Sequence, residues 1–60
     1  MPYVTIEWYE GRTEEQKREL AEKLTALISE VGKTPREHVW IRFVDSSPKD
    51  WAMGGETQRS

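Results

Sequence analysis

Apolar and polar residues alternate in two segments of the chain, residues 2–9 and residues 39–45. The apolar positions of one face are Val4, Ile6 and Trp8 in the first segment and Val39, Ile41 and Phe43 in the second. Successive side chains of a β-strand point to opposite faces, so a period of two predicts a strand that is covered on one side. We therefore expect a strand over each of these two segments.

Residues 14–31 have the pattern of an amphipathic helix. Apolar residues recur at spacings of three and four, at Leu20, Ala21, Leu24, Leu27, Ile28 and Val31. Thr13 and Gln16 have the spacing of a capping box, which satisfies backbone N–H groups at a helix start. Gly32 follows the last apolar residue and is expected to adopt the left-handed conformation that ends many helices.

Shorter segments complete the chain. Pro35 is expected to begin a single short turn that ends at His38. Two serines and a proline at residues 46–48 end the second strand. Residues 51–55 contain two adjacent glycines and predict a loop or short hairpin, and the polar residues 56–60 predict a flexible tail.

The order strand, helix, strand predicts one α+β domain over residues 1–60. It would be a single βαβ unit with parallel strands, followed by the C-terminal loop or hairpin. The helix can cover only one face of a two-stranded sheet, so the other face needs a partner subunit. A chain of 60 residues also buries only about 60% of its unfolded surface. Oligomerisation is the stabiliser left to a small domain without disulfides, so we expect a homo-oligomer.

Composition excludes several classes of function. There is no cysteine and only one histidine, so neither a disulfide framework nor a Cys/His metal cluster is expected. The net charge is −2 with mixed signs, unlike the basic face of a nucleic-acid-binding protein. No apolar run approaches membrane-spanning length, and the N-terminus lacks the features of a signal peptide. We expect a cytoplasmic protein that binds neither nucleic acid nor membrane.

Pro2 is the first candidate for chemistry. Removal of Met1 would leave Pro2 with a free secondary amine. An α-amino group has an ordinary pKa of about 7.7 to 8.0, which a nearby cation or an apolar wall can lower further. Such an amine would act as a general base near neutral pH. The alternative is a proline that merely begins a strand, where its missing N–H costs nothing.

Two further residues could line a site. Arg12 precedes the helix and could bind a carboxylate through two parallel hydrogen bonds, or could be a solvated cation in a turn. Trp51 could be an apolar wall that desolvates an amine, or an aromatic anchor at a subunit contact. The residue types alone do not choose between these alternatives.

Five more positions allow structural and functional interpretations. Trp40 and Arg42 share one strand face and could line a pocket, stack on one another or contact another subunit. His38, the one histidine of the chain, fixes no site by itself and is more simply a surface residue than a proton carrier. Gly54 and Gly55 are more simply required by backbone geometry than by phosphate binding, because no strand-to-helix junction surrounds them.

Taken together, these residues resemble the 4-oxalocrotonate tautomerase family, the short tautomerases that begin with an amino-terminal proline. The resemblance covers the whole chain in one register. It includes Met1-Pro2, residues 10–13 (Glu-Gly-Arg-Thr), residues 15–17 (Glu-Gln-Lys), Pro35, Trp51 and the pair Gly54-Gly55.

The resemblance implies a fold, an assembly and a reaction. βαβ protomers would pair into four-stranded dimers, and three dimers would form a hexamer. Pro2 would take a proton from an enol hydroxyl and return it to carbon, converting 2-hydroxymuconate or a related 2-hydroxydienoate into its 2-oxo isomer. Arg12 of a neighbouring subunit would bind the substrate carboxylate, and Trp51 would keep the pocket apolar. No metal or organic cofactor would be needed.

One position departs from the family pattern. Well-known members have a second arginine where this chain has Trp40, and the nearest cation is Arg42, two residues later on the same strand face. Arg42 could replace that arginine or the second carboxylate contact could be absent. In the latter case we expect weaker use of dicarboxylates and a preference for a monocarboxylate or an aromatic enol.

Two alternatives to a tautomerase remain at this stage. A relative could use the same proline for hydration, dehalogenation, decarboxylation or conjugate addition, with Glu7 or Asp45 as the extra acid that activates water. A non-catalytic oligomeric scaffold or binding module is favoured if Met1 is retained, because Pro2 nitrogen is then an amide and cannot act as a base.

Overall fold

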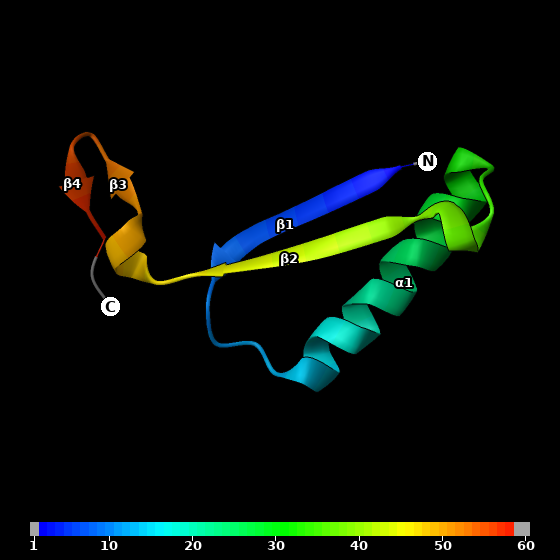
Figure 1. Ribbon diagram of the computed structural model, residues 1–60, viewed down its shortest axis with the longest axis horizontal. Coiled ribbons are helices and arrows are strands. Elements are labelled where there is room, and N and C mark those ends of the chain that lie inside the picture. Colours follow the sequence, from blue (N-terminus) through cyan, green and yellow to red (C-terminus); the bar gives the residue numbers. More distant parts are fainter. Residues whose placement is uncertain (1, 59–60) are drawn as a thin grey trace.

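The computed structural model describes residues 2–58 as a helix layer packed on a small sheet (Figure 1). Strands β1 (Tyr3–Tyr9) and β2 (Trp40–Ser46) form the sheet, and helix α1 (Glu14–Gly32) connects them. The remaining elements are the 3-10 turns η1 (Arg36–His38) and η2 (Pro48–Asp50) and the strands β3 (Ala52–Met53) and β4 (Glu56–Thr57). The predicted α+β architecture with one βαβ unit is confirmed. No helix in this part of the chain combines the length and the apolar character needed to cross a membrane.

β1 and β2 are parallel, and their register runs from Tyr3 opposite Trp40 to Tyr9 opposite Ser46. Exposure alternates along β1, as the sequence predicts. β2 begins and ends one residue later than expected. The N–H of Val39 closes the preceding turn on Arg36 O at 3.0 Å, so Trp40 is the first residue to join the ladder.

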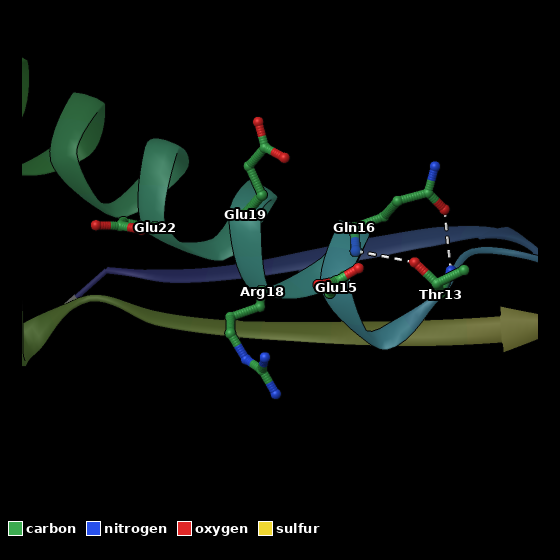
Figure 2. Close-up of a pocket in the computed structure, with 6 residues that line it drawn as sticks. All are labelled: Thr13, Glu15, Gln16, Arg18, Glu19 and Glu22. Atoms are coloured by element: carbon green, nitrogen blue, oxygen red, sulfur yellow. Dashed lines mark hydrogen bonds between the residues drawn. The ribbon is translucent and has the colours of Figure 1, made fainter.

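Helix α1 begins as predicted and ends differently. Thr13 Oγ1 accepts from Gln16 N at 3.1 Å, and Gln16 Oε1 accepts from Thr13 N at 2.9 Å, which completes the capping box (Figure 2). The prediction for the other end is wrong, because the left-handed residue is Lys33, with φ 55°. Gly32 continues the helix, and Lys33 N–H then caps Ser29 O.

The C-terminal segment forms a hairpin that stands apart from α1, beyond the far end of β2 (Figure 1). Gly54 and Gly55, with φ of 62° and 87°, form its two-residue turn, and two positive φ values suit the twist of a tight hairpin. Residues 56 and 57, expected to begin a flexible tail, pair instead with β3. Residues 59 and 60, the end of that expected tail, lie outside the described residues, as does Met1.

The single protomer has no enclosed core: no side chain within residues 2–58 is fully buried. The apolar stripe of α1 is only partly covered, since Leu27 is 55% and Val31 72% exposed. The accessible surface is 5040 Å², whereas a compact protein of this size would expose about 4,100 Å². The radius of gyration is 14.5 Å, against about 10 Å for a compact domain of this length. The protomer therefore has large apolar surfaces that a second subunit could cover.

Candidate active site

Pro2 lies at the start of β1, where β2 fixes its backbone. Trp40 N–H donates to Pro2 O at 3.1 Å. The Trp40 ring meets the Tyr3 ring edge to face, with centroids 6.0 Å apart. A hollow of about 270 Å³ on this part of the sheet is lined by Tyr3, Val4, Thr5, Trp40, Ile41 and Arg42. The structure therefore brings three of the predicted site residues, Pro2, Trp40 and Arg42, to the same end of the sheet.

Arg12 lies beyond the opposite end of β1. Gly11, with φ 131°, allows the chain to turn there in a conformation that few other residues adopt. The Arg12 side chain then folds back over the strand end. Its Nη1 donates to Tyr9 O at 2.8 Å, and its Cζ lies 4.5 Å from the centroid of the Trp8 ring. The cation is thus held against an aromatic face.

Trp51 joins the Arg12 end of the sheet through aromatic contacts. Its ring meets Tyr9 edge to face at 5.8 Å. An apolar hollow of about 330 Å³ is lined by Trp8, Tyr9, Trp51 and Met53. The Trp51 Nε1 atom is buried and has no hydrogen-bond acceptor among the described residues. Trp51 therefore lies in an apolar aromatic cluster at this end of the sheet, and its two predicted roles, apolar wall and subunit anchor, both stay predictions.

Asp45 connects the strand end to the helix. Its Oδ2 accepts from Lys17 Nζ at 2.5 Å and its Oδ1 accepts from Trp8 Nε1 at 2.6 Å. The hydrogen bonds from Lys17 and then Trp8, with the nearby charges of Lys17 and Arg12, lower the pKa of this carboxyl. Asp45 is therefore an ionised carboxylate with both oxygens engaged, which argues against the role of a proton-donating acid.

The two groups of site residues do not meet within one protomer. Pro2 and Arg12 flank a strand of seven residues, and a parallel strand rises about 3.3 Å per residue, so roughly 20 Å separates them. One protomer cannot place Arg12 or Trp51 beside the Pro2 nitrogen. A site containing all three would need residues from at least two chains, as expected for Arg12.

The remaining candidate positions have few features that would suit substrate or metal binding. His38 lies exposed in η1, and Glu7 lies on the face of the sheet opposite α1. A wide hollow on α1 is lined by Thr13, Glu15, Gln16, Arg18, Glu19 and Glu22 (Figure 2). Its three carboxylates would repel an anionic substrate. Residues 2–58 contain no group of three or more side chains able to hold a metal ion.

Sequence reasoning missed the surroundings of Arg12. It placed Trp8 on one strand face with Val4 and Ile6, and it gave Tyr9, Met53 and Lys17 no role around a site. Trp8 and Arg12 are four residues apart across a turn that contains a glycine, which is a signal that their side chains can meet. The pairing of Trp8 with Asp45 depends on the strand register, for which no local signal exists.

Comparisons with known proteins give a consistent result. The profile of the family described as "Tautomerase enzyme" matches residues 2–59. A probable tautomerase of Bacillus cereus is 48% identical over 56 residues, which are 93% of this chain and 92% of that protein.

Solved structures are similar over most of their length. YwhB, a homologue of 4-oxalocrotonate tautomerase, has a TM-score of 0.84 and 36% identity, covering 93% of this chain and 92% of the other. trans-3-Chloroacrylic acid dehalogenase has a TM-score of 0.79 and 33% identity, covering 97% of this chain and 95% of the other.

Proposed function

This chain belongs to the tautomerase family, and from that membership we propose that it is a cofactor-free isomerase that converts 2-hydroxydienoates, or related enols, into their 2-oxo isomers. The observation that carries the proposal is the place of Pro2. It is the first residue of the family match and stands at the start of β1, held there by the hydrogen bond from Trp40. With Met1 removed, its ring nitrogen is a secondary amine at the end of the sheet.

The proposed reaction is a proton transfer between oxygen and carbon. The Pro2 amine takes the proton of the enol hydroxyl, the electron pair moves through the conjugated system, and the resulting ammonium returns the proton to carbon. An amine with a pKa near the working pH suits both steps, because it must accept and donate the same proton. The reaction is redox-neutral and needs no further reactant.

The carboxylate end of the substrate is assigned to Arg12 of a neighbouring protomer. A guanidinium can bind a carboxylate through two parallel hydrogen bonds, and it draws electron density from the reacting system. Trp51 would line the same site and exclude water. The separation of Pro2 from these two residues within one protomer supports a site shared between chains.

The assembly that would complete the site is a homo-oligomer, which we propose to be a hexamer built as a trimer of dimers. The uncovered face of the sheet carries Tyr3 and Trp40, which are 70% and 58% exposed. Aromatic surface of this kind is typical of subunit contacts. A cytoplasmic location goes with this proposal and remains an expectation.

Trp40 and Arg42 would select among substrates. Trp40 occupies the place nearest Pro2 on β2, and Arg42 lies two residues further along, opposite Thr5 in the ladder. If Arg42 binds a second carboxylate, Arg42→Ala should remove a preference for 2-hydroxymuconate over phenylenolpyruvate. If no such preference exists in the native chain, Trp40 favours the monocarboxylate or aromatic substrate.

Replacing the base tests the reaction. Pro2→Ala should lower kcat/KM for 2-hydroxymuconate by at least about 100-fold, because general base catalysis contributes about that much or more. The native rate should rise with pH as the amine loses its proton. Pro35→Ala, which changes a proline of the η1 turn, is the matched control and should keep the native rate.

Intact mass decides whether the amine is free. A fully active sample in which every chain retains Met1 or a formyl group would contradict the proposal. Unchanged turnover in Pro2→Ala would also contradict it, and would favour a non-catalytic scaffold or another site.

A second candidate is dehalogenation, favoured by the similarity to trans-3-chloroacrylic acid dehalogenase. Hydrolytic dehalogenation needs a group that activates water. Both oxygens of Asp45 accept hydrogen bonds, and Glu7 lies on the open face of the sheet. Chloride release from trans-3-chloroacrylate at a rate comparable to the isomerisation would favour this second function.

A further inference from the structure

The Arg12 guanidinium is restrained although it lies near the surface. A free arginine side chain samples many rotamers, and ordering it costs up to about 2 kcal/mol. Here Nη1 donates to Tyr9 O at 2.8 Å and Cζ lies 4.5 Å from the Trp8 ring centroid. A guanidinium over an aromatic face keeps its in-plane N–H groups available. The remaining donors of Arg12 can therefore point to a ligand in a fixed direction.

Trp8 is itself fixed by two contacts. Its Nε1 donates to Asp45 Oδ1 at 2.6 Å, and its ring stacks on Phe43 with centroids 5.6 Å apart and an interplanar angle of 18°. Trp8 and Asp45 are partners in the β1–β2 ladder, so the strand register places acceptor and donor together. The orientation of the indole that supports Arg12 thus depends on Asp45.

Lys17 completes the arrangement from α1. Its Nζ lies 2.5 Å from Asp45 Oδ2, and the two side chains are 27% and 32% exposed. The charges of Lys17 and Asp45 largely cancel each other. Asp45 therefore does not neutralise Arg12, whose positive charge remains available to a ligand. Without Lys17, Asp45 would compete with a substrate carboxylate for the guanidinium.

We propose that Asp45 is a positioning residue: by accepting from Trp8 and pairing with Lys17, it holds the indole on which the Arg12 guanidinium rests, and so aims Arg12 at the substrate carboxylate. Asp45 does not touch the substrate and moves no proton. This inference rests on the proposed role of Arg12 as the carboxylate ligand.

Steady-state kinetics of the full chain with 2-hydroxymuconate provide the first test. Asp45→Ala should raise KM about 3- to 10-fold, the range that corresponds to losing a partly exposed cation–π contact. kcat should fall by a smaller factor than KM rises, because the base Pro2 is unaffected and Arg12 is displaced but not removed. Asp45→Asn should recover most of the native KM, since its amide oxygen can still accept from Trp8. Glu30→Ala, at an exposed helix position, is the matched control.

The same substitution in an Arg12→Ala background separates positioning from general structural damage. Asp45→Ala should then add no further rise in KM, because the group that it aims is gone. An equal rise in both backgrounds would overturn the inference. A fall in kcat without a change in KM, or no recovery in Asp45→Asn, would overturn it as well.

Nuclear relaxation of the Arg12 side chain gives a readout that does not depend on activity. The Nε–H order parameter of Arg12 should fall in Asp45→Ala and return in Asp45→Asn, with Arg42 as the internal reference. An unchanged order parameter would overturn the positioning role. A second outcome separates the two proposals. If the order parameter falls in Asp45→Ala but Arg12→Ala leaves KM unchanged, Asp45 does position Arg12. Arg12 then does not bind the substrate carboxylate, and the proposed carboxylate site is overturned.

Discussion

At the scale of single residues, the charge of Asp45 couples stability to pH. The hydrogen bonds from Lys17 and Trp8 lower its pKa in the folded chain, whereas the unfolded chain has the ordinary value of about 3.9. A lowered folded pKa means that the stabilisation is present above the unfolded value. It is lost as pH falls through the folded value. Asp45 therefore contributes to acid unfolding below about pH 4.

Thermal unfolding from pH 6 to pH 2, at one fixed protomer concentration, tests this contribution. The midpoint of the native chain should fall more steeply below pH 4 than that of Asp45→Asn, which cannot titrate. Glu19→Gln is the control: Lys23 lowers the pKa of Glu19 in the same direction, but both side chains are largely exposed and such pairs contribute little. Parallel curves for the native chain and Asp45→Asn would contradict the prediction.

Residue identity supplied the candidates for the proposed site but not the contacts that surround them. Pro2, Arg12 and Trp51 stand out by chemistry and by position in the sequence. The alternation predicted a strand over residues 2–9, and a strand of about that length is enough to place Pro2 and Arg12 far apart. The contact between Trp8 and Asp45 was not predictable, because the register of two parallel strands is set by packing across the sheet and not by either strand alone.

At the scale of elements, the residue that follows the last residue of α1 is not suited to its conformation. Lys33 has φ 55°, which costs an L-residue with a side chain about 1–2 kcal/mol. Glycine removes this cost, although it adds about 0.4–1 kcal/mol of unfolded-state entropy. Lys33→Gly should therefore raise the free energy of unfolding by about 0.5–1 kcal/mol.

Urea denaturation at constant protomer concentration measures this change. Gly32→Ala is a matched comparison, because Gly32 is helical and an added Cβ would lie 4.0 Å from Thr34 Cγ2. It should stabilise the helix by about 0.5–1 kcal/mol. A lower unfolding free energy in Lys33→Gly would show that Lys33 makes a compensating contact.

The helix end also shows where sequence reasoning fails by one residue. Glycine after the last apolar position is the usual signal for the left-handed residue, and here the helix continues through Gly32. Ser29 explains the extension: its Oγ donates to Thr34 O at 2.6 Å, and its carbonyl accepts from the N–H groups of Lys33 and Thr34. These contacts form only when the turn is one residue longer.

At the scale of the whole molecule, a protomer without a buried side chain within residues 2–58 should owe its stability to association. We expect a thermal midpoint that rises with protomer concentration, because mass action stabilises an oligomer that the unfolded chain cannot form. Sedimentation at micromolar concentration should show a single assembly, and a mass of six chains would agree with the proposed hexamer. A monomer with a concentration-independent midpoint would contradict both expectations.

The distance between the two ends of β1 predicts that two inactivating variants can complement each other in a mixed assembly. If each site takes Pro2 from one chain and Arg12 from another, two defective alleles can complement each other. Pro2→Ala and Arg12→Ala assemblies should each have a much lower kcat/KM than the native chain, yet chains refolded as a mixture should regain part of the native rate in hybrid particles that contain some intact sites. Simple mixing of the two preformed assemblies, without subunit exchange, should restore nothing.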